Sequence, residues 1–259
     1  MAVKGNHTIL SFNVYFIRES DVCSVVCRQT FMLVDQFPDV KHVVMDEVHN
    51  YEQDIGTESW HQKARKLVRQ HDPDKPGYLW FFIDKCQSSH TFLTGIPPES
   101  QQKPQFALRK VIRNSHKIFS HSKAYVPDND VKNNIEMGHD FEGEDVKVIC
   151  YSRSAESQVD VVNETLDRLL DEGYRKGDIA VLFKKKECIP NGLSFHYKSA
   201  TENSSEFIVV SSVLKYSGLE RPVVVLVDVG IMKGRKTKPF IYGAVTRGMV
   251  KLVIIRCKN

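Results

Sequence analysis

The sequence predicts an α/β fold, in which helices flank sheets of mostly parallel strands. Apolar runs bounded by polar turns recur along the 259 residues, and most of them are continuous rather than alternating. Continuous apolar runs are typical of parallel strands that are buried on both faces. Helical patterns lie between the runs, and this alternation is characteristic of α/β proteins. The predicted strands include 79–83, 146–150, 179–183, 207–213, 223–229 and 252–255.

Three segments carry helical patterns between these strands. In residues 156–172, valines and leucines recur at spacings of three and four, and Gly173 follows as a stop signal. Residues 57–70 and 104–113 are also predicted to be helical.

The composition of the chain changes between about residues 120 and 145, where it becomes polar and rich in Asn, Asp and Gly. We interpret this stretch as a connection between two units, although it also fits a long surface loop. The predicted division is a first domain over 1–120, a connecting segment over 121–145 and a second domain over 146–259.

Charge and cysteine content narrow the class of protein. A net charge of +4 permits binding to nucleic acid without requiring it. The basic clusters at 184–186 and 233–238 fit either solvated loops or phosphate contacts. The six cysteines are scattered without a CxxC pair, which favours reduced thiols and an intracellular protein of the nucleus or cytoplasm. No apolar run approaches the ~18–20 residues that span a bilayer, so we expect no membrane segment.

The stretch VVMDEVHNYE, residues 43–52, predicts a buried strand that ends on the carboxylates of Asp46 and Glu47. A carboxylate at such a position needs a positive or hydrogen-bonding partner. Mg²⁺ takes oxygen ligands and keeps several waters, so Asp46 is a candidate Mg²⁺ ligand. Glu47 would then polarise an attacking water.

Two further stretches offer polar groups at the ends of apolar segments. LWFFIDKCQSSH, residues 79–90, places Asp84 at a strand end and Gln87 three positions later. The amide of Gln87 both donates and accepts, so it can sense a γ-phosphate or its water. Arg113 follows an apolar run, and arginine suits bidentate phosphate contact. Taken singly, these residues also fit a polar strand exit and an exposed surface side chain.

In the second half, Gly218 and Glu220 lie in a turn between two predicted strands. Arg247 ends a short predicted helix before the last strand. Such an arginine can stabilise charge on a transferring phosphoryl group.

The order of these motifs is that of superfamily 1 helicases. More closely, the chain resembles the C-terminal helicase-like region of the long Schlafen proteins over nearly its whole length. The resemblance is carried by TFMLVDQFPDVKHVVMDEVHNYE, LWFFIDKCQSSHTFLTGIPP, LRKVIRNSHKI, GYRKGDIAVLF and YSGLERPVVV.

This resemblance implies two RecA-like lobes with a nucleotide cleft between them, ATP and Mg²⁺ as cofactors, and RNA or DNA as a partner. A Schlafen-family or other protein is a further implied partner, and the family is tied to restriction of viral replication. Catalytic roles fall on Glu47, Gln87, Arg113 and Arg247, and nucleotide contacts on Asp46, Asp84, Gly218 and Glu220, with Asp46 as the Mg²⁺ ligand.

The chain departs from the family in one respect that concerns its activity. The phosphate-loop pattern G-x-x-x-x-G-K-[ST] occurs nowhere in it. In the family this loop precedes a strand resembling TILSFNVYF, so we expect an incomplete first lobe, no nuclease core and little or no ATP hydrolysis. Three interpretations stay open: an impaired helicase or ATPase-like module, a non-enzymatic RNA-, DNA- or partner-binding module of the same fold, and a non-functional fragment.

Overall fold

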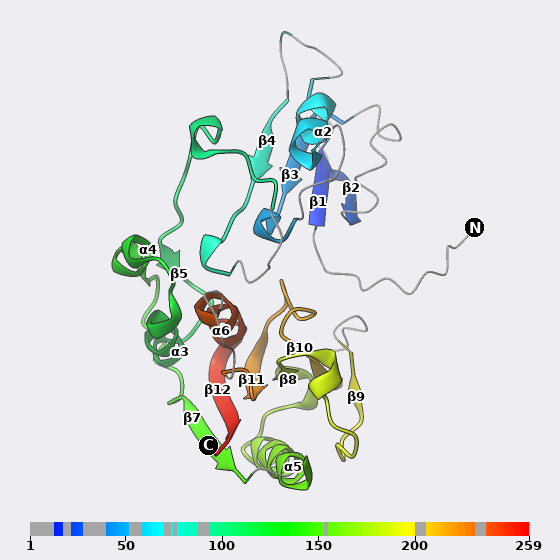
Figure 1. Cartoon of the computed structure of the whole chain (residues 1–259), viewed down its shortest axis with the longest axis vertical. Coiled ribbons are helices and arrows are strands. Elements are labelled where there is room, and N and C mark those ends of the chain that lie inside the picture. Colours follow the sequence, from blue (N-terminus) through cyan, green and yellow to red (C-terminus); the bar gives the residue numbers. More distant parts are fainter. Residues whose placement is uncertain are drawn as a thin grey trace, which may run out of the picture. The chain divides into compact units, whose positions relative to one another are not determined.

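The computed structural model divides into two compact units, shown in Figure 1, which we call the N-terminal unit (Ser11–Ala107) and the C-terminal unit (including Leu108–Asn259). The predicted first domain ended at residue 120, whereas the N-terminal unit ends at Ala107. The described residues are 13–17, 22–27, 40–51, 59–69, 74, 77–87, 94–152, 155–199, 206–230 and 237–258.

The N-terminal unit contains a sheet with the strand order β2-β1-β3-β4. β1 pairs antiparallel with β2 and β3, whereas β3 and β4 are parallel. The strand that was predicted to deliver Asp46 is β3. The bounds are Asn13–Ile17 for β1, Val22–Cys27 for β2, His42–Met45 for β3 and Leu79–Phe81 for β4.

Helix α2, Trp60–Leu67, lies within the predicted helix 57–70. Its start is fixed by a capping box, because the Ser59 hydroxyl accepts from the Gln62 amide and the Gln62 side chain accepts from the Ser59 amide. The Trp60 ring is fully buried, meets the ring of Tyr51 edge-on at a centroid distance of 5.5 Å and donates from Nε1 to the Thr94 carbonyl. Trp60 therefore anchors the apolar core of this unit.

The C-terminal unit is built on a sheet with the strand order β7-β12-β11-β8-β10-β9, and all its strand pairs are parallel. This sheet confirms the predicted α/β class and each of the predicted strands beyond residue 145. The bounds are Lys147–Tyr151 for β7, Ile179–Phe183 for β8, Tyr197–Lys198 for β9, Ile208–Ser212 for β10, Arg221–Val227 for β11 and Gly248–Cys257 for β12.

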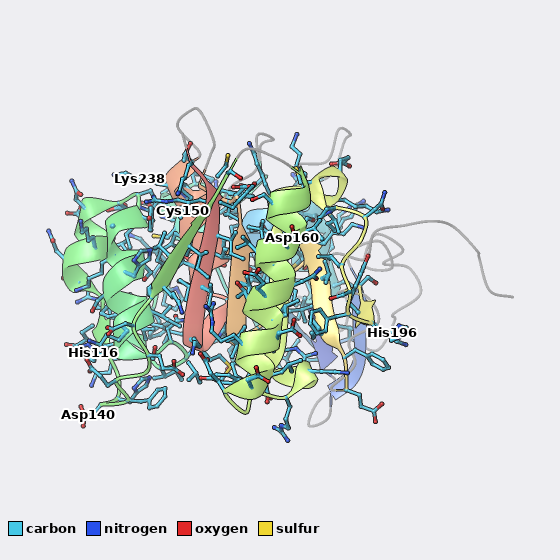
Figure 2. All side chains as sticks on the ribbon, turned by 90° about the horizontal axis from the view of Figure 1, so that it is seen from below. His116, Asp140, Cys150, Asp160, His196 and Lys238 are labelled. Carbon is cyan, nitrogen blue, oxygen red and sulfur yellow. The ribbon has the colours of Figure 1, made fainter. Side chains whose placement is uncertain are left out.

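Helices cover both faces of this parallel sheet. Helix α5, Ala155–Asp171, confirms the helix predicted at 156–172 and buries Val162, Leu166 and Leu169 against one face (Figure 2). Helices α3, His116–Ser122, and α6, Thr237–Val245, cover the other face through Ile118, Phe240 and Ala244.

The helix predicted over 104–113 is wrong. None of these residues is helical, and β5, Lys110–Val111, pairs with β6, Glu136–Met137. Its apolar side chains do not form a buried stripe, since Leu108 and Ile112 are 85% and 75% exposed. Without burial of an apolar face a short helix gains little stability, and pairing with β6 satisfies the backbone instead.

The polar stretch 121–145 was expected to be a connection, and it contains regular structure. It includes helix α4, Asn129–Asn134, whose first amides donate to the carboxylate of Asp128. Single 3-10 turns complete the described elements: η2 Val48–Asn50, η3 Lys85–Gln87, η4 Glu99–Gln101, η5 Lys123–Tyr125, η6 Lys176–Asp178 and η7 Lys186–Cys188.

Two bulk expectations can be compared with the structure. Over the described ranges, no helix combines the length and the apolar character needed to cross a bilayer. Cys86, Cys150, Cys188 and Cys257 carry free thiols, whereas the side chains of Cys23 and Cys27 lie outside the described residues.

Candidate functional site

The acidic pair lies directly after β3. The Asp46 side chain accepts the backbone N–H of Glu47 at 2.8 Å. Glu47 has a φ of 54°, a left-handed conformation that costs a non-glycine residue about 1–2 kcal/mol. Strained residues of this kind concentrate at functional sites, where the surrounding contacts hold them in place.

A buried histidine links this pair to the next strand. The backbone N–H of Asp84 donates to Nδ1 of His49 at 3.1 Å, and Nε2 of His49 lies 3.1 Å from the Glu47 carboxylate. Because Nδ1 accepts, a neutral His49 ring carries its hydrogen on Nε2, which faces the Glu47 carboxylate and also lies 3.2 Å from the Asn50 side-chain amide. His49 is only 2% exposed, so this bridge is part of the packed structure.

The other half of the arrangement follows β4. The Asp84 carboxylate accepts the backbone N–H of Cys86 at 2.9 Å through one oxygen. Its second oxygen accepts the side-chain amide of Gln87 at 2.7 Å. Asp84 thereby orients Gln87, which makes it a positioning residue for the predicted phosphate sensor.

These residues, Asp46, Glu47, His49, Asp84 and Gln87, form what we call the β3–β4 polar cluster. β3 and β4 are parallel and adjacent, so their carboxyl ends meet at one edge of the sheet, and the Val48 N–H joins the Phe82 carbonyl there at 3.2 Å. Ligands of open α/β sheets bind outside the carboxyl ends of strands. Sequence reasoning missed His49, whose only signal was its place two residues after the acidic pair.

The cluster suits a hydrated cation better than a metal enclosed by protein ligands. Within the described ranges, no three His, Cys, Asp or Glu side chains are grouped closely enough to hold a metal ion. Mg²⁺ is commonly held by one or two carboxylates together with waters and substrate phosphates. Asp46, a partly buried carboxylate at a strand end, fits that requirement.

The C-terminal unit brings together the other predicted residues. Arg113 Nε forms an ion pair with the Glu220 carboxylate. The neighbouring Asn114 side chain donates to the carbonyls of Thr246 and Gly248, at 2.9 and 2.6 Å. The segment that carries Arg113 is therefore tied to the turn that carries Arg247.

Arg247 lies in the turn between α6 and β12 and is only 3% exposed. Its carbonyl accepts the backbone N–H of Arg221 at 3.2 Å. The side chain of Arg221 donates to the Gly177 carbonyl. These contacts hold two arginines at the amino ends of β11 and β12.

Tyr216 lies among these charged groups. Burial raises the pKa of Tyr216 to about 12. The positive charges of Arg221 and Arg247 act to lower this pKa, and the negative charge of Glu220 acts to raise it. Gly218 has a φ of 77°, a conformation that glycine adopts without strain, and so permits the turn from Tyr216 to Glu220. Arg113, Tyr216, Glu220, Arg221 and Arg247 form what we call the arginine cluster.

Sequence reasoning missed Tyr216 and Arg221, which flank the Gly-Leu-Glu turn and could have been proposed from that position. The predicted residues thus separate into two sets. Asp46, Glu47, Asp84 and Gln87 belong to the N-terminal unit, and Arg113, Gly218, Glu220 and Arg247 to the C-terminal unit.

No family model matches the chain. Among solved structures, it is similar to the C-terminal domain of a possible DNA helicase from Lactobacillus plantarum WCFS1, with 18% identity and a TM-score of 0.45 over 56% of this chain and 87% of that one. Two structures of the arterivirus helicase nonstructural protein 10, one in complex with DNA, are similar at 17% and 18% identity with TM-scores of 0.39 and 0.40. Each of these two matches spans 82% of this chain but only 38% of the helicase chain. Similarities this low carry no argument about function.

Proposed function

We propose that this chain is a Schlafen-type, helicase-like module that binds a Mg²⁺–nucleotide and nucleic acid and hydrolyses the nucleotide slowly or not at all. The observation that carries the proposal is the β3–β4 polar cluster. Four residues that the motif order singled out, Asp46, Glu47, Asp84 and Gln87, meet at the carboxyl ends of two adjacent parallel strands.

Each side chain of the cluster has a role that follows from its contacts. Asp46 would hold the Mg²⁺, which neutralises phosphate charge when bound. Glu47, which His49 orients, would accept a hydrogen bond from the attacking water. Gln87, which Asp84 orients, would contact the terminal phosphate. Arg113 and Arg247 of the arginine cluster would supply positive charge for a phosphate group.

Slow hydrolysis is expected because no G-x-x-x-x-G-K-[ST] segment occurs in these 259 residues. In P-loop proteins the backbone amides and lysine of that segment surround the phosphates. Loss of a single donor to a developing oxyanion costs about 3–4 kcal/mol in the barrier. The contacts supplied by the β3–β4 polar cluster would still allow the nucleotide to bind, but turnover would be slow.

Calorimetric titration of the whole chain with ATP, with and without Mg²⁺, tests this proposal. We expect binding that requires Mg²⁺ and that Asp46→Asn weakens about tenfold, equivalent to about 1.4 kcal/mol. The exposed Asp160 on α5 provides the matched control, and Asp160→Asn should leave binding unchanged. Binding that is indifferent to both Mg²⁺ and Asp46→Asn would contradict the proposed role of the cluster. Mg²⁺-dependent turnover that Glu47→Gln abolishes would instead show that hydrolysis is not impaired.

A second candidate function is favoured by aromatic side chains on β4 and its flanks. Trp80 lies in β4 and Tyr78 and Phe82 directly flank that strand, and the three side chains are 45%, 69% and 47% exposed. Alternate residues of a strand lie about 6.8 Å apart on one face. The Trp80 ring stacks on that of Phe106 at a centroid distance of 5.9 Å. Rings presented in this way can stack on the bases of single strands, so this face suits a non-enzymatic nucleic-acid-binding module.

Fluorescence anisotropy with a labelled oligo-dT or oligo-U strand tests that candidate without nucleotide. Trp80→Ala should weaken binding by about 1–3 kcal/mol if a base stacks on the ring. The exposed Phe141 of the C-terminal unit is the control, and Phe141→Ala should have no effect. Equal affinity for the wild type and Trp80→Ala would exclude this face as the binding surface.

A further inference from the structure

The ion pair between Arg113 and Glu220 concerns a residue that the proposed function assigns to phosphate binding. Glu220 Oε2 contacts Nε of Arg113, so a carboxylate oxygen already lies at a donor that a phosphate oxygen could accept from. Carboxylate and phosphate oxygens use the same guanidinium donors. Nε of Arg113 therefore cannot donate fully to Glu220 and to a phosphate oxygen at the same time.

The pair is built so that it can open. The side chains of Arg113 and Glu220 are 47% and 36% exposed, although Glu220 Oε2 itself is buried, and ion pairs between partly exposed side chains contribute little to stability. The backbone on either side is held more firmly, by the two hydrogen bonds of Asn114 and by the buried ring of Tyr216. Breaking the pair would change side-chain positions without requiring the chain around it to unfold.

Charge in the cluster is unbalanced, and this favours an anion. Arg113, Arg221 and Arg247 supply three positive charges, against which Glu220 lies at Arg113 and the carboxylate of Asp178 acts on Arg221. Arg113 contacts Glu220, the Arg221 N–H donates to the Arg247 carbonyl at 3.2 Å, and the charges of Glu220, Arg221 and Arg247 all act on the Tyr216 hydroxyl. Removing the carboxylate from Arg113 would leave the cluster more positive.

We propose that Glu220 is an internal counter-anion that occupies Arg113 until a polyphosphate displaces it. This inference rests on the proposed function, because it assumes that Arg113 binds a phosphate group. Glu220 lowers the affinity of Arg113 for a phosphate group, because the incoming anion has to compete with the carboxylate of Glu220. A ligand with several phosphate charges overcomes this competition better than inorganic phosphate does.

Titration of the whole chain with inorganic tripolyphosphate tests this inference. The probe has neither base nor ribose, so a direct contact between Glu220 and a nucleoside cannot contribute. We expect Glu220→Gln to bind tripolyphosphate about two- to five-fold more tightly than the wild type, the gain that release from an exposed ion pair supports. Arg113→Gln should weaken binding, and in the double variant the gain from Glu220→Gln should disappear.

A matched control separates local competition from a general change in charge. Glu164 is exposed on α5, and Glu164→Gln removes the same formal charge away from the arginine cluster. It should leave tripolyphosphate affinity unchanged. Glu220→Asp, which keeps the charge on a shorter side chain, should give an intermediate affinity and provides a second variant if Glu220→Gln folds poorly.

The outcomes distinguish the two proposals. Equal affinity of the wild type and Glu220→Gln, with binding still dependent on Arg113, would overturn the counter-anion role and leave the phosphate role of Arg113 standing. An equal gain in tripolyphosphate affinity in Glu164→Gln would also overturn the counter-anion role, because loss of any carboxylate would then be enough to raise the affinity. No binding in any variant would contradict both.

Discussion

Asp228→Ala is expected to destabilise the C-terminal unit by about 3 kcal/mol. The Asp228 carboxylate accepts the backbone N–H of Cys257 at 2.9 Å, the Gln158 amide at 2.7 Å and the Tyr151 hydroxyl. These bonds join the carboxyl ends of β11, β12 and β7 to helix α5. A buried donor that loses its acceptor costs about 1–3 kcal/mol, and Tyr151 is buried.

Backbone strain adds to this loss. Asp228 has a φ of 52°, which Asp and Asn tolerate better than Ala does. Asp228→Asn should therefore cost less than Asp228→Ala, since it keeps one acceptor oxygen and the tolerated backbone. Asp228→Gly removes the acceptors but relieves the strain, so it should be more stable than Asp228→Ala by about 1 kcal/mol.

Thermal unfolding followed by circular dichroism measures these differences. A loss of 3 kcal/mol should lower Tm by about 6–12 °C in a unit of this size. Asp160, labelled on helix α5 in Figure 2, is the exposed control, and Asp160→Ala should shift Tm little. If all three Asp228 variants melt with the wild type, these hydrogen bonds do not hold the strand ends together.

Lys251→Met is expected to destabilise the same unit by about 2 kcal/mol near neutral pH. Lys251 is 7% exposed, and its Nζ lies 2.5 Å from the carboxylates of both Glu144 and Glu172. Removing the lysine leaves two carboxylates without their shared cation. The cost is below the 3–5 kcal/mol of a fully buried pair because both glutamates are partly exposed.

The contribution of Lys251 and its glutamate partners to stability is expected to depend on pH. Burial alone would lower the pKa of Lys251, but hydrogen bonds to Glu144 and Glu172 outweigh it and the pKa is raised. Burial likewise favours a higher pKa for Glu144, but hydrogen bonds from Lys251 and Tyr174 leave it lowered. The glutamate contribution is therefore present above its ordinary pKa of 4.5 and lost as the pH falls through the folded value. The lysine contribution is present below 10.5 and lost as the pH rises through its raised value.

Denaturant unfolding at several pH values tests this expectation. The wild type should lose stability below about pH 4.5 and above about pH 10.5, and both slopes should flatten in Lys251→Met. Adding Glu144→Gln to Lys251→Met should recover part of the loss, because it removes one of the two carboxylates left without a cation. A variant as stable as the wild type across the range would show that the lysine contributes nothing net.

The local pattern of apolar residues was sufficient to predict most strands of the parallel sheet in the C-terminal unit and its helix α5. Strands β8, β10 and β11 and helix α5 were predictable because each buries side chains whose spacing identifies the element without knowledge of its neighbours. Asp46, Glu47, Asp84 and Gln87 could likewise be proposed, since the end of an apolar strand is visible in the sequence. The stretch 104–113 was predicted wrongly, because its apolar spacing suggested a helix face that no other element covers.

The contacts that give these residues their surroundings could not be predicted from the sequence. His49 meets Asp84 across 35 positions, Arg113 meets Glu220, and Asp228 meets Tyr151 across 77. Such pairs depend on which strands become neighbours and where each strand ends. The periodicity of a single segment does not contain this information. The chain itself supplies the strands, the helix α5 and the acidic and basic groups at their ends. Only the tertiary structure decides that Asp84 holds the His49 ring beside Glu47 and that Glu220 pairs with Arg113, because both contacts join segments that are distant in the sequence.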